Sequence, residues 1–275
     1  MEWMKKIGYL PVELFQNRRL IWKLSKNDFK TRYAGSYLGI IWAFVQPVIT
    51  VLVYWLVFEK GFSAKAEMMK AGVEVPFVVY LTAGLVPWFF FSEAVSSSTN
   101  ALMEYNYLVK KVVFKISILP LIKVIAAGFI HVFFVGVLLG IASCYGFFPT
   151  VYTLQILYYS FCMFMLVLAL SYTLCSVVVF FRDLTQIVSI GLQIGMWATP
   201  IMWSVSRIHN ETLLFVFRLN PVYYIVNGYR SALFDRVWFW QNGGQTLYFW
   251  GFTLVVFALG TLVFKRLKPH FADVL

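Results

Sequence analysis

The sequence predicts an all-α integral membrane protein with six transmembrane helices. Of its 275 residues, 61% are hydrophobic and 13% are charged, and the mean hydropathy is +0.76. So few polar groups cannot cover the surface of a soluble domain. A helix needs about 20 apolar residues to cross a hydrocarbon core of about 30 Å. Six segments meet this requirement, and they are 38–58, 76–98, 117–142, 151–180, 184–203 and 246–264. They are continuously apolar rather than alternating, which favours helices over a β-barrel.

The distribution of Lys and Arg predicts an N-in/C-in topology. In this orientation 16 of the 23 basic residues fall in the inner segments, as the positive-inside rule requires. The net charge of +11 then faces anionic lipid headgroups, so it does not call for a nucleic acid partner.

Residues 1–37 are predicted to form a cytoplasmic segment with an amphipathic helix on the membrane surface. On a helix from Pro11 to Tyr33, an arc of aromatic side chains lies beside an arc of cations, as in interfacial helices. The aromatic residues are Phe15, Trp22, Phe29 and Tyr33, and the cations are Arg19, Lys23, Lys26 and Lys30. Leu20 and Leu24 lie outside the aromatic arc, and a protein partner would cover them. The alternative is an ordinary juxtamembrane anchor.

Two of the apolar segments carry stripes of polar and aromatic residues. The first segment has Trp42, Gln46, Thr50 and Tyr54, and the fifth has Gln186, Ser189, Gln193 and Trp197. Amides and indoles that faced lipid would be costly, so both stripes are expected to face protein or a cavity. Aromatic faces and amides suit sugar rings and their hydroxyls. The alternative is hydrogen bonding between helices with no substrate contact.

The segment 204–245 is too interrupted for a seventh span. A seventh span would place the basic tail 265–275 outside, against the charge bias. We expect short re-entrant or interfacial helices on the outer side, where irregular backbone is tolerated if protein or water covers it.

Several motifs follow one another in a fixed order along the chain. The first group is Asp28, Lys30, Arg32, Tyr33, Gly35, Ser36, Leu38, Gly39, Trp42 and Pro47. Then come Asn100, the run from Tyr107 to Phe114, Leu119-Pro120, Arg182-Asp183-Leu184, Pro200, Asn220-Pro221 and Arg230. In this order the chain resembles, over nearly its whole length, the ABC-2 permeases that export polysaccharides and teichoic acids. It departs from them at Lys115, where the family usually has a proline, so the end of that cytoplasmic helix is not fixed by the resemblance.

The resemblance implies a half-transporter in the bacterial cytoplasmic membrane. A second copy of the permease and two copies of a separate ABC ATPase would complete it, with a lipid-linked glycan passing between the permeases. The chain contains no phosphate-binding loop, so ATP and Mg are expected on the ATPase and no cofactor on this chain. The transmembrane domain would be 38–264.

Within this family the cytoplasmic segment 99–116 corresponds to the helix that couples the permease to the ATPase. The predicted coupling residues are Asn100, Glu104, Tyr107, Leu108, Val109, Lys110 and Lys111. Their mixture of charges with apolar and aromatic side chains suits docking in a groove. The alternative is a solvated loop.

Three GxxxG spacings permit close helix approach, namely Gly35 and Gly39, Gly136 and Gly140, and Gly191 and Gly195. Because the family dimerises through the first and fifth spans, the pairs Gly35 and Gly39, and Gly191 and Gly195, are predicted to pack the dimer.

Ionisable residues inside the apolar segments are candidates for function. Glu93, Lys123 and His131 are such residues, although Glu93 and Lys123 lie near segment ends. A lipid-linked phosphate would need cations at the cytoplasmic mouth, and the candidates are Lys30, Arg32 and Arg182.

Two other functions are alternatives to polysaccharide export. An ABC-2 exporter of drugs or small lipids is disfavoured by the motif of the first span. A membrane-embedded lipid-modifying enzyme would need an acid, base or metal constellation. The sequence has no HExxH motif and no paired carboxylates at metal-ligand spacing, and its three histidines are scattered. We therefore predict a transport subunit with no catalytic residues and no metal site.

Overall fold

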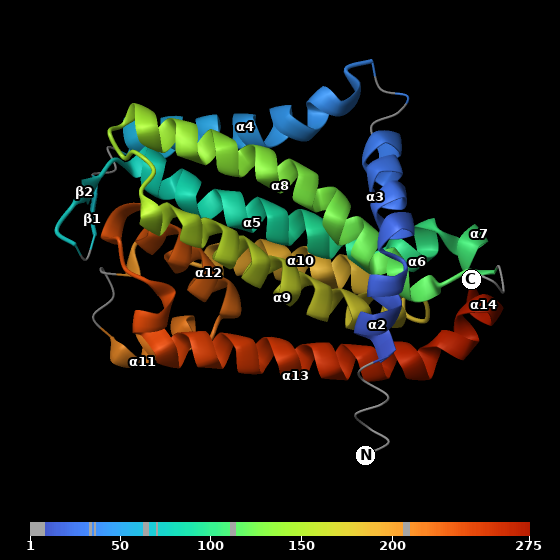
Figure 1. Cartoon of the computed structure of the whole chain (residues 1–275). Coiled ribbons are helices and arrows are strands. Elements are labelled where there is room, and N and C mark those ends of the chain that lie inside the picture. The colour runs from blue at the N-terminus through green and yellow to red at the C-terminus, as the bar shows by residue number, and fades with distance from the viewer. Residues whose placement is uncertain are drawn as a thin grey trace.

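The computed structural model describes residues 9–32, 35, 37–62, 66–69, 71–110, 114–205 and 210–275. The chain folds into a bundle of long helices with short helices at both ends (Figure 1). The long helices are α4 (Trp42–Trp55), α5 (Phe77–Thr99), α8 (Leu119–Cys144), α9 (Gln155–Val178) and α13 (Gly243–Leu267), with a shorter α10 (Leu184–Ala198). The predicted all-α fold class is confirmed.

Five helical segments of the described chain are long and apolar enough to cross a membrane. They are Gly39–Gly61, Phe77–Thr99, Ile116–Cys144, Val151–Val178 and Phe239–Val274. Most extend a long helix through flanking turns, which are η1 (Gly39–Ile41), η2 (Leu56–Gly61), η3 (Ile116–Ile118), η4 (Val151–Leu154), η7 (Phe239–Asn242), η8 (Lys268–His270) and the short helix α14 (Phe271–Val274). The chain is therefore a multi-pass membrane protein.

The fifth predicted span, 184–203, requires a correction. Its helix α10 has 15 residues, which is about 22 Å at 1.5 Å per residue and less than the hydrocarbon core of about 30 Å. The helix stops at Ala198 because Pro200 disfavours helical geometry in the residue before it. Thr199 accordingly has φ −92° and ψ 130°. The last part of this span, residues 199–203, is irregular chain.

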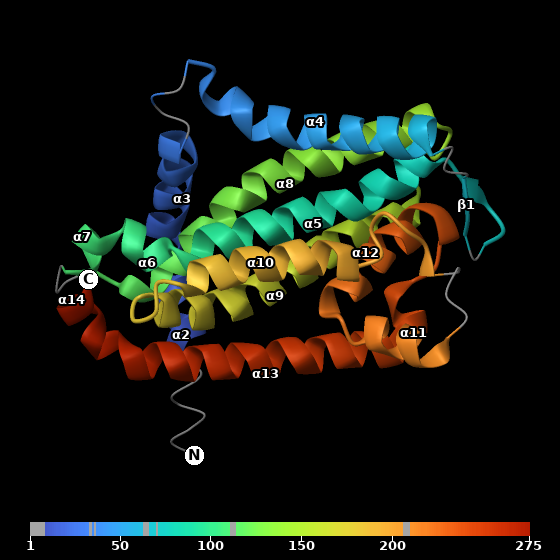
Figure 2. The same cartoon turned by 180° about the vertical axis from the view of Figure 1, so that it is seen from behind.

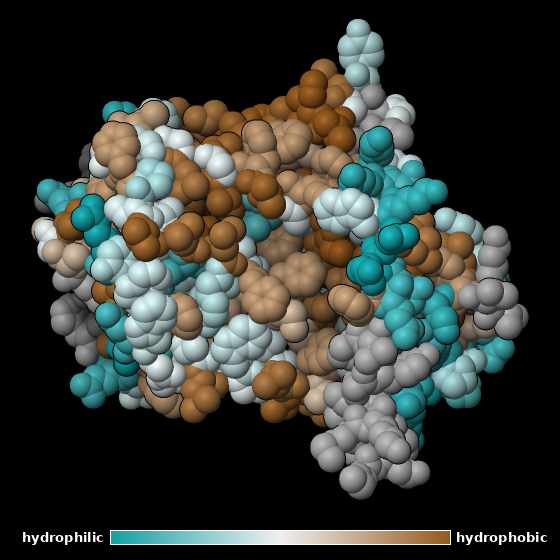
Figure 3. Space-filling model, viewed as in Figure 1, coloured by the Kyte–Doolittle hydropathy of each residue, from teal (hydrophilic) through white to brown (hydrophobic). Residues whose placement is uncertain are grey.

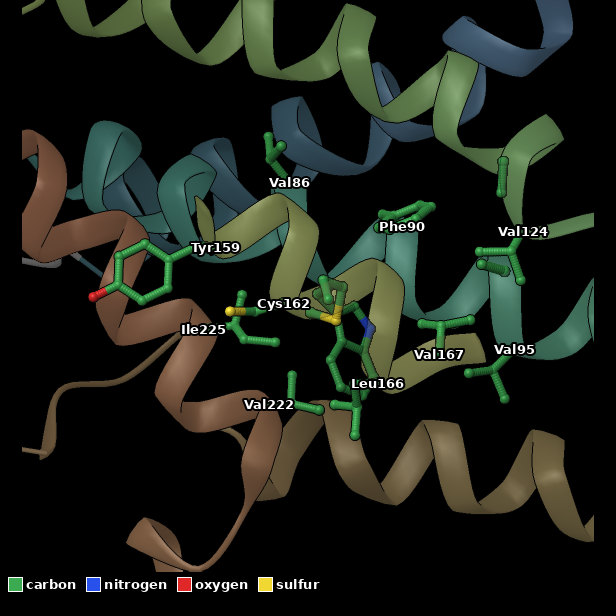
Figure 4. Packing of buried hydrophobic residues seen from close by; sticks show 14 of the residues in the cluster. Val86, Phe90, Val95, Val124, Tyr159, Cys162, Leu166, Val167, Val222 and Ile225 are labelled. Carbon is green, nitrogen blue, oxygen red and sulfur yellow. The ribbon is translucent and has the colours of Figure 1, made fainter. Parts of the chain in front are cut away.

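Helix α5 forms the centre of the bundle. In its most apolar window 78% of the residues are buried, and it packs against α8 and α9. Figure 4 shows part of this core, to which α5 contributes Val86, Phe90 and Val95, α9 contributes Cys162, Leu166 and Val167, and α12 (Pro221–Arg230) contributes Val222 and Ile225.

The predicted N-terminal helix is divided into two. Helices α2 (Tyr9–Gln16) and α3 (Arg18–Arg32) are separated by a turn at Asn17, and they lie across the end of the bundle that also carries α14 (Figure 1). Ile21, Ser25 and Asp28 are the buried residues of α3, which packs on α8. Their spacing of four and three residues places them on one helical face.

The aromatic residues of the predicted N-terminal helix contact α8 on one side and remain partly exposed on the other. Trp22 and Phe29 contact the ring of Phe129 in α8, with centroids 5.3 and 5.7 Å apart, yet Trp22 stays 50% exposed. Leu24 packs on the chain's own core, whereas Leu20 is exposed. Tyr33 lies outside the described residues.

Gly35 lies in a turn after α3, and Gly39 is the first residue of the short 3₁₀ turn η1. Their φ angles are 93° and 53°, values that only glycine adopts readily. The interpretation of this pair as a helical GxxxG face is therefore wrong, because the two residues do not share a helix.

The segment 204–245 contains short elements at the opposite end of the bundle. They are α11 (Glu211–Arg218), α12, the π-helical turn η6 (Ser231–Asp235) and η7. Most of α12 is buried, and it contacts α5 and α9. A small antiparallel hairpin, β1 (Glu67–Met68) and β2 (Glu74–Val75), lies beside them (Figure 1). The N–H of Ala71 donates to the Asp235 carboxylate at 3.1 Å, which ties the hairpin to η6.

Candidate functional site

A buried lysine joins three elements at the α3 end of the bundle. Lys123 of α8 donates from Nζ to Asp28 Oδ1 of α3 at 2.6 Å, and to Glu104 Oε2 of α6 (Ala101–Glu104) at 2.5 Å. The side chains of Lys123 and Asp28 are 4% and 5% exposed, whereas that of Glu104 is 52% exposed. A buried charge is stable only when it is paired, so Asp28 and Lys123 hold each other in place.

Tyr105 extends this network into the coupling segment. It lies between α6 and α7 (Asn106–Val109), and its hydroxyl donates to Asp28 Oδ1 at 2.6 Å. Burial, and next the hydrogen bond to Asp28, raise the pKa of Tyr105 well above 10.0. The phenol is therefore a fixed donor, and the stability it contributes is present from about pH 7 up to 10.0 and decreases at higher pH.

Arg32 and Glu93 complete the network. Arg32 pairs with Glu93 of α5 and lies 3.5 Å from Asp28. A polar pocket of about 460 Å³ borders these side chains. We call the following set the polar junction: Asp28, Arg32, Glu93, Glu104, Tyr105 and Lys123. Arg32, predicted as a phosphate contact, already has two carboxylate neighbours here.

The coupling segment is also tied to α10. The Thr185 hydroxyl donates to Asn100 Oδ1 at 3.1 Å. Asn100 thus connects the start of the coupling segment to the first turn of the helix that carries the second polar stripe. The segment of α6 and α7 therefore contacts α3, α8 and α10 directly, and a movement of this segment can displace those helices.

The outward surface of the coupling segment differs from the predicted one at one residue. Tyr107, Lys110 and Glu104 are exposed, and Leu108 is half-buried. Val109 is 3% exposed, so it packs inside the chain and is not a surface contact. Lys111 lies outside the described residues.

Helices α4 and α10 leave an open face on the other side of the bundle. Figure 2 shows them on either side of α5, and both contact α5. Only 6% of the apolar window of α4 is buried, and α10 has no buried residue. Both predicted stripes are exposed or half-buried: Trp42, Gln46, Thr50, Tyr54, Gln186, Ser189, Gln193 and Trp197. Tyr54 packs against the edge of the core, and the other seven side chains are not part of it.

The glycines of α10 differ in their surroundings. A Cβ at Gly191 would meet nothing within 4 Å, while one at Gly195 would lie 3.0 Å from the Trp88 ring. The absence of a side chain at Gly195 therefore allows α10 to pack closely on Trp88. Gly191 has no neighbour of this kind within the chain and lies on the open face without a side chain.

Comparisons with known proteins agree with this architecture. The ABC-2 type transporter family matches residues 19–234. The chain belongs to the ABC-2 transporter family. It is 31% identical over 226 residues to a protein of Myxococcus xanthus named O-antigen export system permease protein RfbA, which covers 82% of this chain and 84% of that one. Two Klebsiella pneumoniae proteins of the same name are 25% and 26% identical, each over 92% of this chain and 93% of their own length.

A second buried cation stabilises the opposite end of this ABC-2 chain. The Arg230 guanidinium donates to the carbonyls of Pro200 and Ile201 at 2.6 and 2.7 Å, and lies 3.6 Å from the centroid of the Tyr80 ring. These two carbonyls belong to the irregular chain after α10, so Arg230 satisfies backbone that the helix break leaves free. Gly84 makes room for it, since a Cβ there would lie 2.8 Å from Arg230 Nη2.

The remaining predicted residues of the ABC-2 chain divide into two groups. Lys30 and Arg182 are exposed, and within the described residues neither forms an ion pair. His131 is buried, where it bonds to Ser160 and Tyr229 at 3.1 and 3.0 Å. Lys30 and Arg182 therefore remain open to a ligand, and His131 is part of the core.

Sequence reasoning did not anticipate the roles of Asp28, Tyr105 and Arg230. A signal was present for Asp28: it shares a helical face with Ile21 and Ser25, the other buried residues of α3. No signal in a single sequence connects Arg230 with residues 200 and 201.

Proposed function

We propose that the chain is the permease subunit of an ATP-driven exporter of a lipid-linked polysaccharide in the bacterial cytoplasmic membrane. Membership of the ABC-2 family supports a transport subunit that works with an ABC ATPase. The names of the relatives favour O-antigen over teichoic acid as the kind of cargo. The observation that carries the proposal is the open face of α4 and α10, with its stripe of amides and aromatic rings.

Two copies of the chain would form the channel by bringing these faces together. A protein with so much exposed apolar surface on two helices requires lipid or a partner there. A second copy would cover the apolar residues and enclose the polar stripes between the permeases. Sugar rings stack on Trp and Tyr, and their hydroxyls bond to Gln. ATP and Mg would be bound by two separate ATPase subunits.

The polar junction fits an N-in/C-in orientation with six crossings. Helices α2, α3, α6, α7 and α14 lie at one end of the bundle (Figure 1), and the short α10 with its irregular continuation would supply the crossing between α9 and α13. Lys30 and Arg182 are exposed and would meet the lipid-linked phosphate at the cytoplasmic mouth.

The channel is tested by export assays in cells that lack the native protein. Trp42→Ala and Gln193→Ala should each reduce export of the glycan while leaving assembly with the ATPase intact. Trp240→Ala and Gln245→Ala are matched controls from outside the open face. Normal export by both stripe variants, or loss of assembly in them, would contradict the channel role.

The dimer is tested by cross-linking. In a chain whose native cysteines are replaced by alanine, Gln193→Cys should form a disulfide between two copies in membranes, because it lies on the open face. Leu247→Cys, which is exposed on α13, should not. The reverse pattern would place the interface elsewhere.

Coupling is tested at Tyr107, which is exposed on α7. Tyr107→Ala should lower the stimulation of the ATPase by substrate without changing the thermal stability of the permease. Tyr145→Ala, an exposed tyrosine after α8, is the control. Unchanged stimulation would remove Tyr107 from the contact with the ATPase.

A further inference from the structure

An apolar groove lies beneath the N-terminal helices. It has a volume of about 640 Å³ and is enclosed by α2, α3, α8, α9 and α13, within the range of about 300–1,000 Å³ that is usual for ligand sites. Figure 3 shows this face hollowed beside the hydrophilic column of α3. Its lining is almost entirely apolar and includes Leu14, Ile21, Ile125, Leu168, Leu254 and Phe257.

The groove runs along the spans rather than across them. On α13 it is lined from Trp250 to Phe257, a rise of about 10 Å at 1.5 Å per residue. Trp22 of α3 and Leu121 near the start of α8 line it at the α3 end. Its direction along the spans matches that of a lipid acyl chain in the adjacent leaflet.

The α3 end of the groove carries a cation. Arg18 lines the groove and is exposed. Its Nη1 donates to the carbonyl of Phe15 at 3.3 Å, and its guanidinium lies 4.8 Å from the Phe15 ring. In the part of the chain that the structure describes, no carboxylate pairs with it. Arg19, Lys23 and Lys26 add further exposed charge along α3.

We propose that this groove binds one acyl chain of an anionic phospholipid of the surrounding membrane, with Arg18 bound to its phosphate. An acyl chain carries no polar groups, so it suits an apolar slot beside lipid-facing helices. A peptide would bring backbone N–H and C=O groups that nothing in the groove could satisfy. Arg18 supplies the complementary charge for a phosphate.

The proposal does not depend on transport of a glycan. A lipid in this position fills the space between α3 and α13, and so it holds the N-terminal helices against the bundle. The lipid is a structural component of the permease that comes from the membrane itself.

The test uses the permease purified together with its ATPase and reconstituted in nanodiscs of mixed phosphatidylglycerol and phosphatidylcholine. After transfer to detergent, the phospholipid retained per permease is measured by native mass spectrometry. Leu254→Trp fills the groove from an exposed position on α13, and Leu259→Trp is its control on the same helix, with exposures of 61% and 55%. Arg18→Gln removes the cation, and Arg19→Gln is its neighbour outside the groove lining.

We expect the wild type and both controls to retain phosphatidylglycerol. Leu254→Trp should retain about tenfold less of either lipid, and Arg18→Gln about tenfold less phosphatidylglycerol with no loss of phosphatidylcholine, a change equivalent to ~1.4 kcal/mol. Equal retention in all five proteins would overturn the proposal. So would a preference for phosphatidylglycerol that survives Arg18→Gln. A retained lipid-linked glycan in native membranes, in place of phospholipid, would refute the assigned occupant.

Discussion

The two buried cations of this chain are held in opposite ways. Lys123 is bonded to carboxylates on two other elements, Asp28 of α3 and Glu104 of α6, and a polar pocket lies beside it. Arg230 donates to backbone carbonyls, those of Pro200 and Ile201 in the irregular chain and that of Tyr80 in α5, and its guanidinium lies over the Tyr80 ring. Side-chain ion pairs can exchange partners while the helices stay intact. When a bond to a buried backbone carbonyl breaks, that carbonyl is left without a partner at a cost of about 1–3 kcal/mol.

The difference assigns different tasks to the two ends of the molecule. The polar junction includes a half-exposed member, Glu104, and connects the coupling segment to α3 and α8. It is therefore suited to change when an ATPase moves. At the other end a pocket of about 300 Å³ borders Arg230, but its guanidinium is bonded to backbone carbonyls, so this end is suited to remain rigid. Four substitutions test this contrast.

The largest effect is expected from Arg230→Met. It leaves two buried carbonyls unpaired and removes the contact with Tyr80, which together cost about 4–8 kcal/mol. We expect loss of monodisperse protein in size-exclusion chromatography. Arg218→Met, at an exposed arginine of α11, should behave as wild type. If Arg230→Met and Arg218→Met gave the same elution profile, the Arg230 end would not be the rigid part of the molecule.

Lys123→Met should be the next in size. It leaves Asp28 buried without its main partner, at a cost of about 3–5 kcal/mol, visible as a lower melting temperature in detergent. Adding Asp28→Leu should restore much of the stability, because no buried charge remains, but should not restore stimulation of the ATPase. A double variant as unstable as the single one would show that the pair does not act as an ion pair.

Tyr105→Phe should have an intermediate effect. It removes one hydrogen bond to a carboxylate, about 1.5–3 kcal/mol. The loss should be the same from about pH 7 to 10.0, since the pKa of Tyr105 is raised by burial and the phenol stays protonated in the folded chain. Tyr107→Phe is the control, because Tyr107 is exposed. If the loss of stability caused by Tyr105→Phe changed with pH between about 7 and 10.0 in melting experiments, it would contradict the assignment of Tyr105 as donor.

The smallest change in stability is expected from Glu104→Gln. Its carboxylate is 52% exposed, and ion pairs at the surface contribute about 0–1 kcal/mol. Its effect should appear instead as weaker coupling of ATP hydrolysis to substrate. A loss of stability as large as that of Lys123→Met would show that the junction is as rigid as the Arg230 end.

The sequence was a good guide wherever hydropathy alone decides the structure. The five long helices follow from apolar length, and the short elements of 204–245 follow from the interruptions in that segment. The chain before the first span was predicted as one helix, and the turn at Asn17 was not foreseen because no proline or glycine marks it.

Contacts between distant residues could not be predicted in the same way. Lys123 and Glu93 stood out as charges near span ends, but their partners Asp28 and Arg32 are found only when α3 is packed on the bundle. The stop of α10 at Ala198 was signalled by Pro200, yet an apolar continuation to residue 203 outweighed that signal. Gly35 and Gly39 have the spacing of a GxxxG motif, but their backbone is not helical, so in this case the spacing was misleading.

The early stop of α10 also has a consequence for a hydrophilic cargo. The barrier that a polymer of sugars meets in a membrane grows with the thickness of the dry layer it must cross. Beside α10, the wall of regular helix is about 22 Å high rather than about 30 Å, and Gln186, Ser189 and Gln193 occupy its first three turns. A chain of sugars that passes along this helix would therefore exchange water for protein hydrogen bonds over a shortened distance.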